Sequence, residues 1–182
     1  MFLKANTILN AFKKWSDSNL LALNIDKTTY ICFAINKTGI PTEESNYNLK
    51  IHNNCMYSFI CNCPKLCQSK YVKYLGILID QNLKWNTHIN CLCLKLRKIM
   101  YKFVQLRYSM PVTILKTIFL ALVQSIIQYG IISWGGLSQM AILPLVLLHK
   151  RIIKICLKKK MYYPTHLILR EFNILKINEI YK

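Results

Sequence analysis

Hydrophobic residues follow two different periods along this chain, and the change comes near residue 88. In residues 3–19 the apolar side chains recur every three or four positions, which predicts a helix with one apolar face that packs on a sheet. That face comprises Ala5, Ile8, Leu9, Phe12 and Trp15. β-Branched and aromatic residues then dominate 29–35 and 71–79, and each run predicts one strand. The first part of the chain therefore predicts mixed helix and strand.

After residue 88 the period becomes helical. Residues at spacings of three and four are apolar on one side: Ile89, Leu92, Leu96, Ile99, Phe103 and Leu106. A second set, on another side of the same helix, is polar or cationic: Lys95, Lys98, Lys102 and Gln105. This pattern predicts a two-faced helix, with a hydrophobic core on one side and positive charge on the other.

Two more helices are expected after this one. Residues 113–128 are apolar except for a narrow polar edge, which predicts the buried centre of a helical bundle. A third helix should carry Pro144 in its first turn, because proline lacks the amide hydrogen that first-turn residues leave unbonded. Its basic residues are expected to point outward: Lys150, Arg151, Lys154 and Lys158. Trp85 and Trp134 lie in apolar segments beside turns, so we interpret both as core residues.

The charge of the chain is strongly positive. Its 182 residues include 25 lysine and arginine side chains against 7 aspartate and glutamate side chains, a formal net charge of +18. A charge so far from zero indicates a polyanionic partner, of which nucleic acid is the commonest. Residues 91–182 carry 15 basic and 2 acidic side chains, so this half is expected to make most of the phosphate contacts. A merely solvated helix face would carry glutamate among its lysines.

We recognise no secretory signal or clear membrane span in the sequence. The first nineteen residues carry scattered lysine and aspartate, which predicts an intracellular protein of the nucleus or cytoplasm. Residues 117–134 are the one candidate span, but they include Gln124, Gln128 and Gly130 and are barely long enough. We interpret them as a buried helix and its exit, with no membrane partner. A small membrane protein is the alternative.

Metal sites are also poorly supported by the sequence. Four cysteines cluster at Cys55, Cys61, Cys63 and Cys67. They lack the C-x2-C pairs from which tetrahedral zinc sites are usually built, so we interpret them as thiols in a loop, with a zinc site as the alternative. The carboxylates Asp17, Asp26, Asp80, Glu43 and Glu44 are not spaced to hold catalytic ions. Because two-metal phosphoryl transfer needs several carboxylates, we expect this chain alone to bind no metal cofactor.

Three segments of the chain together resemble a known family. They are WSDSNLLALNIDKTTYICF (15–33), YVKYLGILIDQNLKWNTHI (71–89) and SIIQYGIISWGG (125–136). In this order and spacing they are similar to the back half of reverse transcriptases from non-LTR (LINE-type) retrotransposons, which are RNA-directed DNA polymerases that use Mg²⁺. The Tyr-x-Asp-Asp motif that holds the metal in this family does not occur here. The resemblance implies a fragment or degenerate copy, inactive alone, whose partners are the upstream palm and fingers.

The resemblance also implies roles for individual residues. Lys27 matches a lysine proposed to protonate the leaving pyrophosphate as a general acid. Tyr74, Leu75 and Gly76 match the primer grip, a hairpin that holds the 3′ end of the growing strand, and Lys73 adds a charge beside it. The thumb residues that would follow the backbone of the RNA–DNA template–primer duplex are Lys95, Lys98, Lys102 and Arg107. The alternative explanation for Gly76 is a β-bulge in a core strand.

The sequence thus predicts an α+β fold in two parts. The resemblance implies that residues 1–87 form the end of a polymerase palm, a helix plus short antiparallel strands with a primer-grip-like hairpin. Residues 88–182 are expected to form an all-α, thumb-like bundle of three helices. The alternative function is a non-enzymatic basic module that binds RNA or serves as a structural partner, with zinc at the cysteine cluster.

Overall fold

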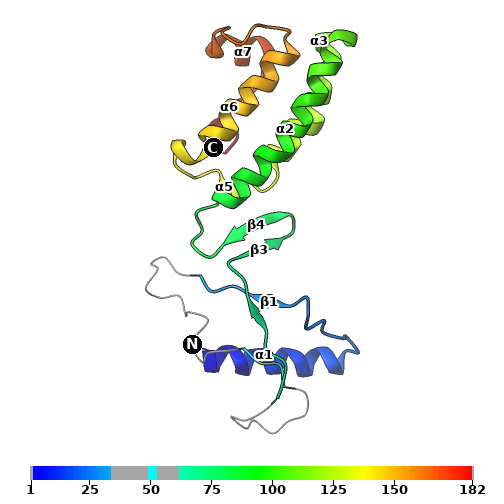
Figure 1. Cartoon of the computed structure of the whole chain (residues 1–182), viewed down its shortest axis with the longest axis vertical. Helices are drawn as coiled ribbons and strands as arrows, with labels where there is room; N and C mark the ends of the chain where they lie inside the picture. The colour runs from blue at the N-terminus through cyan, green and yellow to red at the C-terminus, as the bar shows by residue number, and fades with distance from the viewer. Residues whose placement is uncertain (1, 34–48, 53–61, 182) are drawn as a thin grey trace. The chain divides into compact units, whose positions relative to one another are not determined.

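The computed structural model describes residues 2–33, 49–52 and 62–181 (Figure 1). The chain divides into two compact units, Met1–Lys84 and Trp85–Lys182, whereas the sequence analysis placed the boundary after residue 87. The described residues combine helices with two small strand pairs, so the expected α+β class is confirmed.

In the first unit, helix α1 (Phe2–Ser18) lies against a small apolar core. The buried residues of this core are Leu49, Ile51 and Leu66. The amide oxygen of Asn6 accepts a hydrogen bond from the backbone N–H of Lys50 at 3.0 Å. The amide oxygen of Asn10 accepts one from the backbone N–H of His52 at 3.3 Å. These bonds satisfy backbone donors that would otherwise be costly to bury, and they explain why Asn10 is buried.

The prediction that the whole apolar face of this helix packs on a sheet is wrong. Ala5 and Leu9 do pack against the small core. Ile8, Phe12 and Trp15 are instead 70%, 47% and 56% exposed. The physical reason is the position of Asn6 and Asn10 on the helix. Their side chains face residues 49–52, because that segment has backbone N–H groups that need acceptors.

The strand expected over 29–35 is much shorter in the structure. Only Thr29–Tyr30 forms a strand, β1, which pairs in parallel with β2 (Cys67–Gln68). Residues 31–33 are irregular, and residues 34–35 lie outside the described residues. The neighbouring strand is itself two residues long, so it offers no further partners for a longer ladder.

The run 71–79 forms a hairpin, as the match to the primer grip implied, whereas its apolar pattern alone predicted a single strand. Strands β3 (Tyr71–Tyr74) and β4 (Ile77–Asp80) pair in antiparallel fashion, with Tyr74 opposite Ile77. The two residues between them, Leu75 and Gly76, have φ values of 45° and 84°. Two successive positive φ angles are the mark of the tight turns that match the twist of paired strands. Within the apolar run 71–79, only Gly76 is a residue type that indicates a turn.

The second unit is a bundle of helices. They are α2 (Asn86–Ser109), α3 (Val112–Phe119), the π-helical turn η2 (Leu120–Gln124), α4 (Ser125–Gln128), α5 (Ile131–Trp134), α6 (Gln139–Cys156), α7 (Thr165–Phe172) and α8 (Ile177–Tyr181). Figure 1 shows α2 and α6 side by side, and they form the most extensive helix pair of the unit. The two-faced helix predicted after residue 88 is confirmed as α2.

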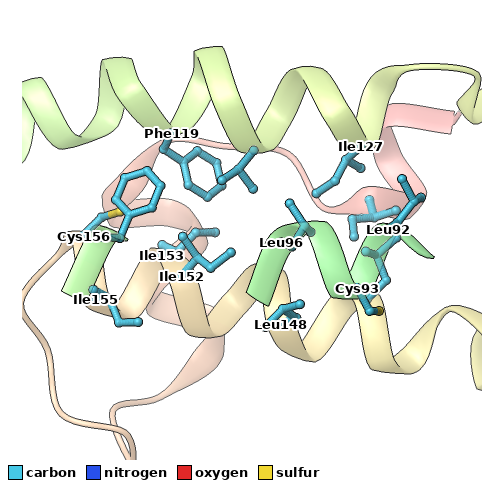
Figure 2. Packing of buried hydrophobic residues seen from close by; sticks show 14 of the residues in the cluster. Leu92, Cys93, Leu96, Phe119, Ile127, Leu148, Ile152, Ile153, Ile155 and Cys156 are labelled. Atoms are coloured by element: carbon cyan, nitrogen blue, oxygen red, sulfur yellow. The ribbon is translucent and has the colours of Figure 1, made fainter. Parts of the chain in front are cut away.

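The main helices of this unit share one hydrophobic core. Figure 2 shows side chains of α2, α3 and α6 that gather in the interior, among them Leu96, Phe119 and Ile152, all 0% exposed. Trp134 is buried in the same core, and Trp85 is half-buried against it. Both tryptophans are therefore core residues, as the sequence predicted.

The buried centre of the bundle is α6, and the prediction that residues 113–128 form it is wrong. Nine residues of α6 are buried, whereas Ile114 and Leu122 of the predicted centre are 47% and 45% exposed. Helix α6 is enclosed because α2, α3 and α7 all contact it. The segment 113–128 buries Leu115, Phe119, Val123 and Ile127 in the core, but its other apolar side chains, among them Ile114, Leu120 and Leu122, face solvent.

Two details of α6 also differ from expectation. The helix begins at Gln139, capped by the hydroxyl of Ser138, which accepts a hydrogen bond from the N–H of Ala141. Pro144 therefore lies inside the helix and not in its first turn. Lys154, expected to point outward, is buried at 8% exposure because its ammonium donates a hydrogen bond to the carbonyl of Met161. The other three basic side chains are exposed or half-buried.

Helices α7 and α8 were not predicted, so a bundle of three helices is an incomplete description. Ile168, Leu169 and Phe172 of α7 are buried in the core, and the ring of Phe172 meets that of Phe119 edge to face at 5.3 Å. Their spacings of one and three residues were a helical signal in the sequence.

None of the described helices is long and apolar enough to cross a membrane. The candidate span 117–134 is interrupted at Gly130, whose φ of 66° ends the helical run.

Candidate nucleic-acid interface

One side of α2 presents three lysines to solvent. Lys95, Lys98 and Lys102 are all exposed, because the helical period turns them away from the buried side chains of Leu96 and Phe103. We call these three lysines the α2 lysine stripe. Helix α2 contains no acidic residue.

The charge of this stripe is not balanced by carboxylates in the described part of the chain. The ion pairs found there are Lys13–Asp17, Lys159–Glu171 and Lys176–Glu179. None of them involves α2. Uncompensated cations on an exposed helix attract a polyanion more strongly than paired ones do.

Arg107 differs from the three lysines in its setting. It is half-buried, and its guanidinium carbon lies 5.1 Å from the ring centroid of Tyr108. Twelve residues after Lys95, it is rotated by about 120° around the helix. Arg107 is therefore a neighbour of the α2 lysine stripe and not a member of it.

The hairpin of β3 and β4 presents the residues matched to a primer grip. Tyr74 and Leu75 are 64% and 71% exposed at its turn. Lys73 is exposed as well, but side chains alternate along a strand, so Lys73 and Tyr74 point to opposite faces. Gly76 lies in the turn and not inside a strand, so a β-bulge in a core strand is ruled out as the reason for this glycine.

Lys27 lies in a turn that precedes β1. The side-chain oxygen of Asn24 accepts a hydrogen bond from the backbone N–H of Lys27 at 3.1 Å, and the Lys27 side chain is exposed. Downstream, the backbone N–H of Ser69 donates to the carbonyl of Tyr30 at 2.8 Å. That bond ties the segment after Lys27 to the start of β3. From Tyr71, the first residue of β3, the hairpin turn at Leu75 is four extended residues away, about 13 Å along the strand.

The described carboxylates do not fit the magnesium site of a polymerase. Asp17 pairs with Lys13, and Asp80 accepts hydrogen bonds from two backbone N–H groups just after β4. Glu171 and Glu179 pair with lysines of their own unit. Within the described residues, no three His, Cys, Asp or Glu side chains gather as metal ligands would. We therefore derive no metal-dependent step from this chain.

The zinc hypothesis falls partly outside the structure. Cys55 and Cys61 lie outside the described residues, while Cys63 is half-buried and Cys67 is exposed. The hypothesis stays a prediction.

Sequence reasoning missed a second basic surface in the helical unit. A groove of about 540 Å³ lies between α2, α6 and the chain that follows α6. Its cationic lining residues are Arg97, Lys150, Arg151 and Lys154. We call it the α2–α6 groove. The basic spacing on α6 was a signal for it, but Arg97 lies off the lysine stripe and only the packing of the two helices brings these residues together.

Comparisons with protein-family models, with curated proteins and with solved structures find no match for this chain. The resemblance to reverse transcriptases rests on the three sequence segments alone.

Proposed function

We propose that this chain is the palm-end and thumb portion of a non-LTR retrotransposon reverse transcriptase, and that it holds an RNA–DNA template–primer duplex without catalysing synthesis. The observation that carries the proposal is the α2 lysine stripe. Three exposed lysines stand on a helix that has no acidic residue, and they are held there by a buried opposite face.

The spacing of the stripe suits a nucleic-acid backbone. From Lys95 to Lys102 the helix advances by about 10 Å. Successive phosphates of one strand rise by about 3.4 Å, so the stripe covers about three base steps. Lysine contacts to phosphate fix position without reading sequence, and a polymerase must hold whatever sequence it copies.

The other matched residues take supporting roles in this proposal. The exposed turn of Tyr74 and Leu75 would contact the end of the primer strand. Lys27 would serve as a proton donor only if a reacting phosphate came within hydrogen-bond reach. Since the described carboxylates are engaged locally or scattered, the metal ions would have to be held by the upstream palm.

Binding and incorporation measured together test the proposal. We expect the purified chain to bind a fluorescently labelled RNA–DNA duplex, with affinity that falls steeply as salt rises. With Mg²⁺ and nucleotides added, we expect no primer extension. Absence of duplex binding at low salt would contradict the proposed role, and primer extension by the chain alone would contradict the assignment of catalysis to another segment.

A further inference from the structure

The α2–α6 groove combines positive charge with an apolar lining. Among the described residues that line it, none is acidic. The apolar residues are Leu143, Pro144, Leu147, Leu148 and Met161. Leu143 and Leu147 are 42% and 57% exposed, so the groove offers apolar surface to a ligand. A purely electrostatic surface would not need this apolar area.

The groove and the α2 lysine stripe lie at different angles around α2. Arg97 is about 200° from Lys95 and about 100° from Lys98. On α6, Leu147 and Arg151 are one turn apart and share a face. The ammonium of Lys154 donates to the carbonyl of Met161 and so ties the following chain to α6 as the third wall.

The chemistry of this groove fits an unpaired strand better than a duplex. A duplex presents phosphates outside and stacks its bases within, whereas an unpaired strand offers both phosphates and base faces. Proteins that bind single strands accordingly combine a positive groove with aromatic side chains on which the bases stack. Tyr101, 65% exposed and one helical turn after Arg97, extends this surface along α2.

We propose that the α2–α6 groove binds an unpaired strand of nucleic acid. Arg97, Lys150 and Arg151 bind its phosphates, while Leu143 and Leu147 lie under its bases. Lys154 is committed to the Met161 carbonyl and acts as a wall of the groove. This inference rests on the proposed function, because it assigns the unpaired part of a template–primer to one surface and the paired part to another.

The double variant R97Q/R151Q tests the charge of the groove. We expect it to bind labelled oligothymidylate at least about tenfold more weakly, with the salt slope reduced by about 1.4. Binding of a blunt RNA–DNA duplex should change less than threefold. The control K4Q/K14Q removes the same charge from two exposed positions of α1 and should alter neither affinity appreciably. If R97Q/R151Q binds oligothymidylate as the unaltered chain does, and the duplex still binds, the proposed role of the groove is wrong. The proposed function is not contradicted by that result.

A second variant tests the apolar lining without any change of charge. L147Q alters an exposed side chain, so the fold should be kept. We expect oligothymidylate binding to weaken several-fold while its salt slope stays constant. Unchanged binding would overturn the assignment of a base to this side chain. An oligoglutamate peptide serves as a competitor. If it displaces oligothymidylate at equal charge concentration, the groove does not prefer nucleic acid over an acidic protein segment, and the proposal is wrong.

Discussion

At the scale of single residues, the hairpin turn shows how much can depend on one glycine. Leu75 and Gly76 both adopt positive φ, a conformation that costs a side-chain-bearing residue roughly 1–2 kcal/mol. Leu75 carries that cost already. A side chain at Gly76 would add a second strained residue to a two-residue turn.

Substitutions at Gly76 distinguish between a role of this glycine in the turn and a role in a primer grip. We expect G76A to destabilise the hairpin by about 1 kcal/mol and G76N by less, because asparagine tolerates positive φ. Amide hydrogen exchange in β3 and β4 measures this difference. If a sugar–phosphate backbone approaches the glycine closely, both variants weaken duplex binding. If the glycine serves only the turn, G76N binds the duplex as the unaltered chain does.

His149 is a buried titratable side chain in the core of the helical unit. It is 2% exposed and lies 5.4 Å from the ring of Phe119. Burial, and secondarily the charge of Lys150, lowers the pKa of His149 from 6.5 to about 4. The unfolded chain therefore takes up a proton at a pH where the folded chain does not.

This pKa predicts a loss of stability in mild acid. As pH falls from about 6.5 to about 4, protonation favours the unfolded state, and the loss between pH 7 and pH 5 should be about 2 kcal/mol. Urea unfolding at the two pH values measures it. H149L serves as the comparison, since its pH dependence should be smaller by that amount. Equal pH dependence in both proteins would contradict the prediction.

At the scale of elements, the two faces of α2 have different roles. Its apolar side joins the core, and its opposite side carries the α2 lysine stripe. The lysine side chains are exposed and do not pack in the hydrophobic core. Charge can therefore be removed from this helix without loss of packing.

Removing the stripe should weaken duplex binding in a defined way. We expect K95Q/K98Q/K102Q to lower affinity for an RNA–DNA duplex and to reduce the slope of log affinity against log salt by up to about 3. The control K4Q/K14Q/K65Q removes the same number of charges from exposed sites of the first unit. A titration across several salt concentrations gives the slope. If the stripe variant and the control have the same slope, the stripe is not part of the interface.

Other elements could be predicted only in part, for identifiable reasons. The helical period of residues 88–106 was enough to place α2, since its two faces differ sharply. The segment 113–128 is apolar almost all round, so its pattern could not say which side has neighbours. The short strands are held by contacts between 29–30 and 67–68, which are far apart in sequence.

At the scale of the whole molecule, positive charge gathers in two distinct places of the helical unit. The α2 lysine stripe follows from a spacing of three and four residues along one helix. The α2–α6 groove joins Arg97 to basic residues more than fifty positions later. The resemblance in three segments implied that the first surface follows the duplex backbone, and it gave no indication of the second surface.

The sequence by itself determined the features that depend on local spacing: the helical period, the excess of positive charge and the core tryptophans. These follow from side chains a few residues apart, whose geometry in a helix is nearly constant. Only the tertiary structure decided which apolar faces are covered and that α2 and α6 together form a groove. Those outcomes depend on which elements become neighbours, and the pattern of a single element does not contain that information.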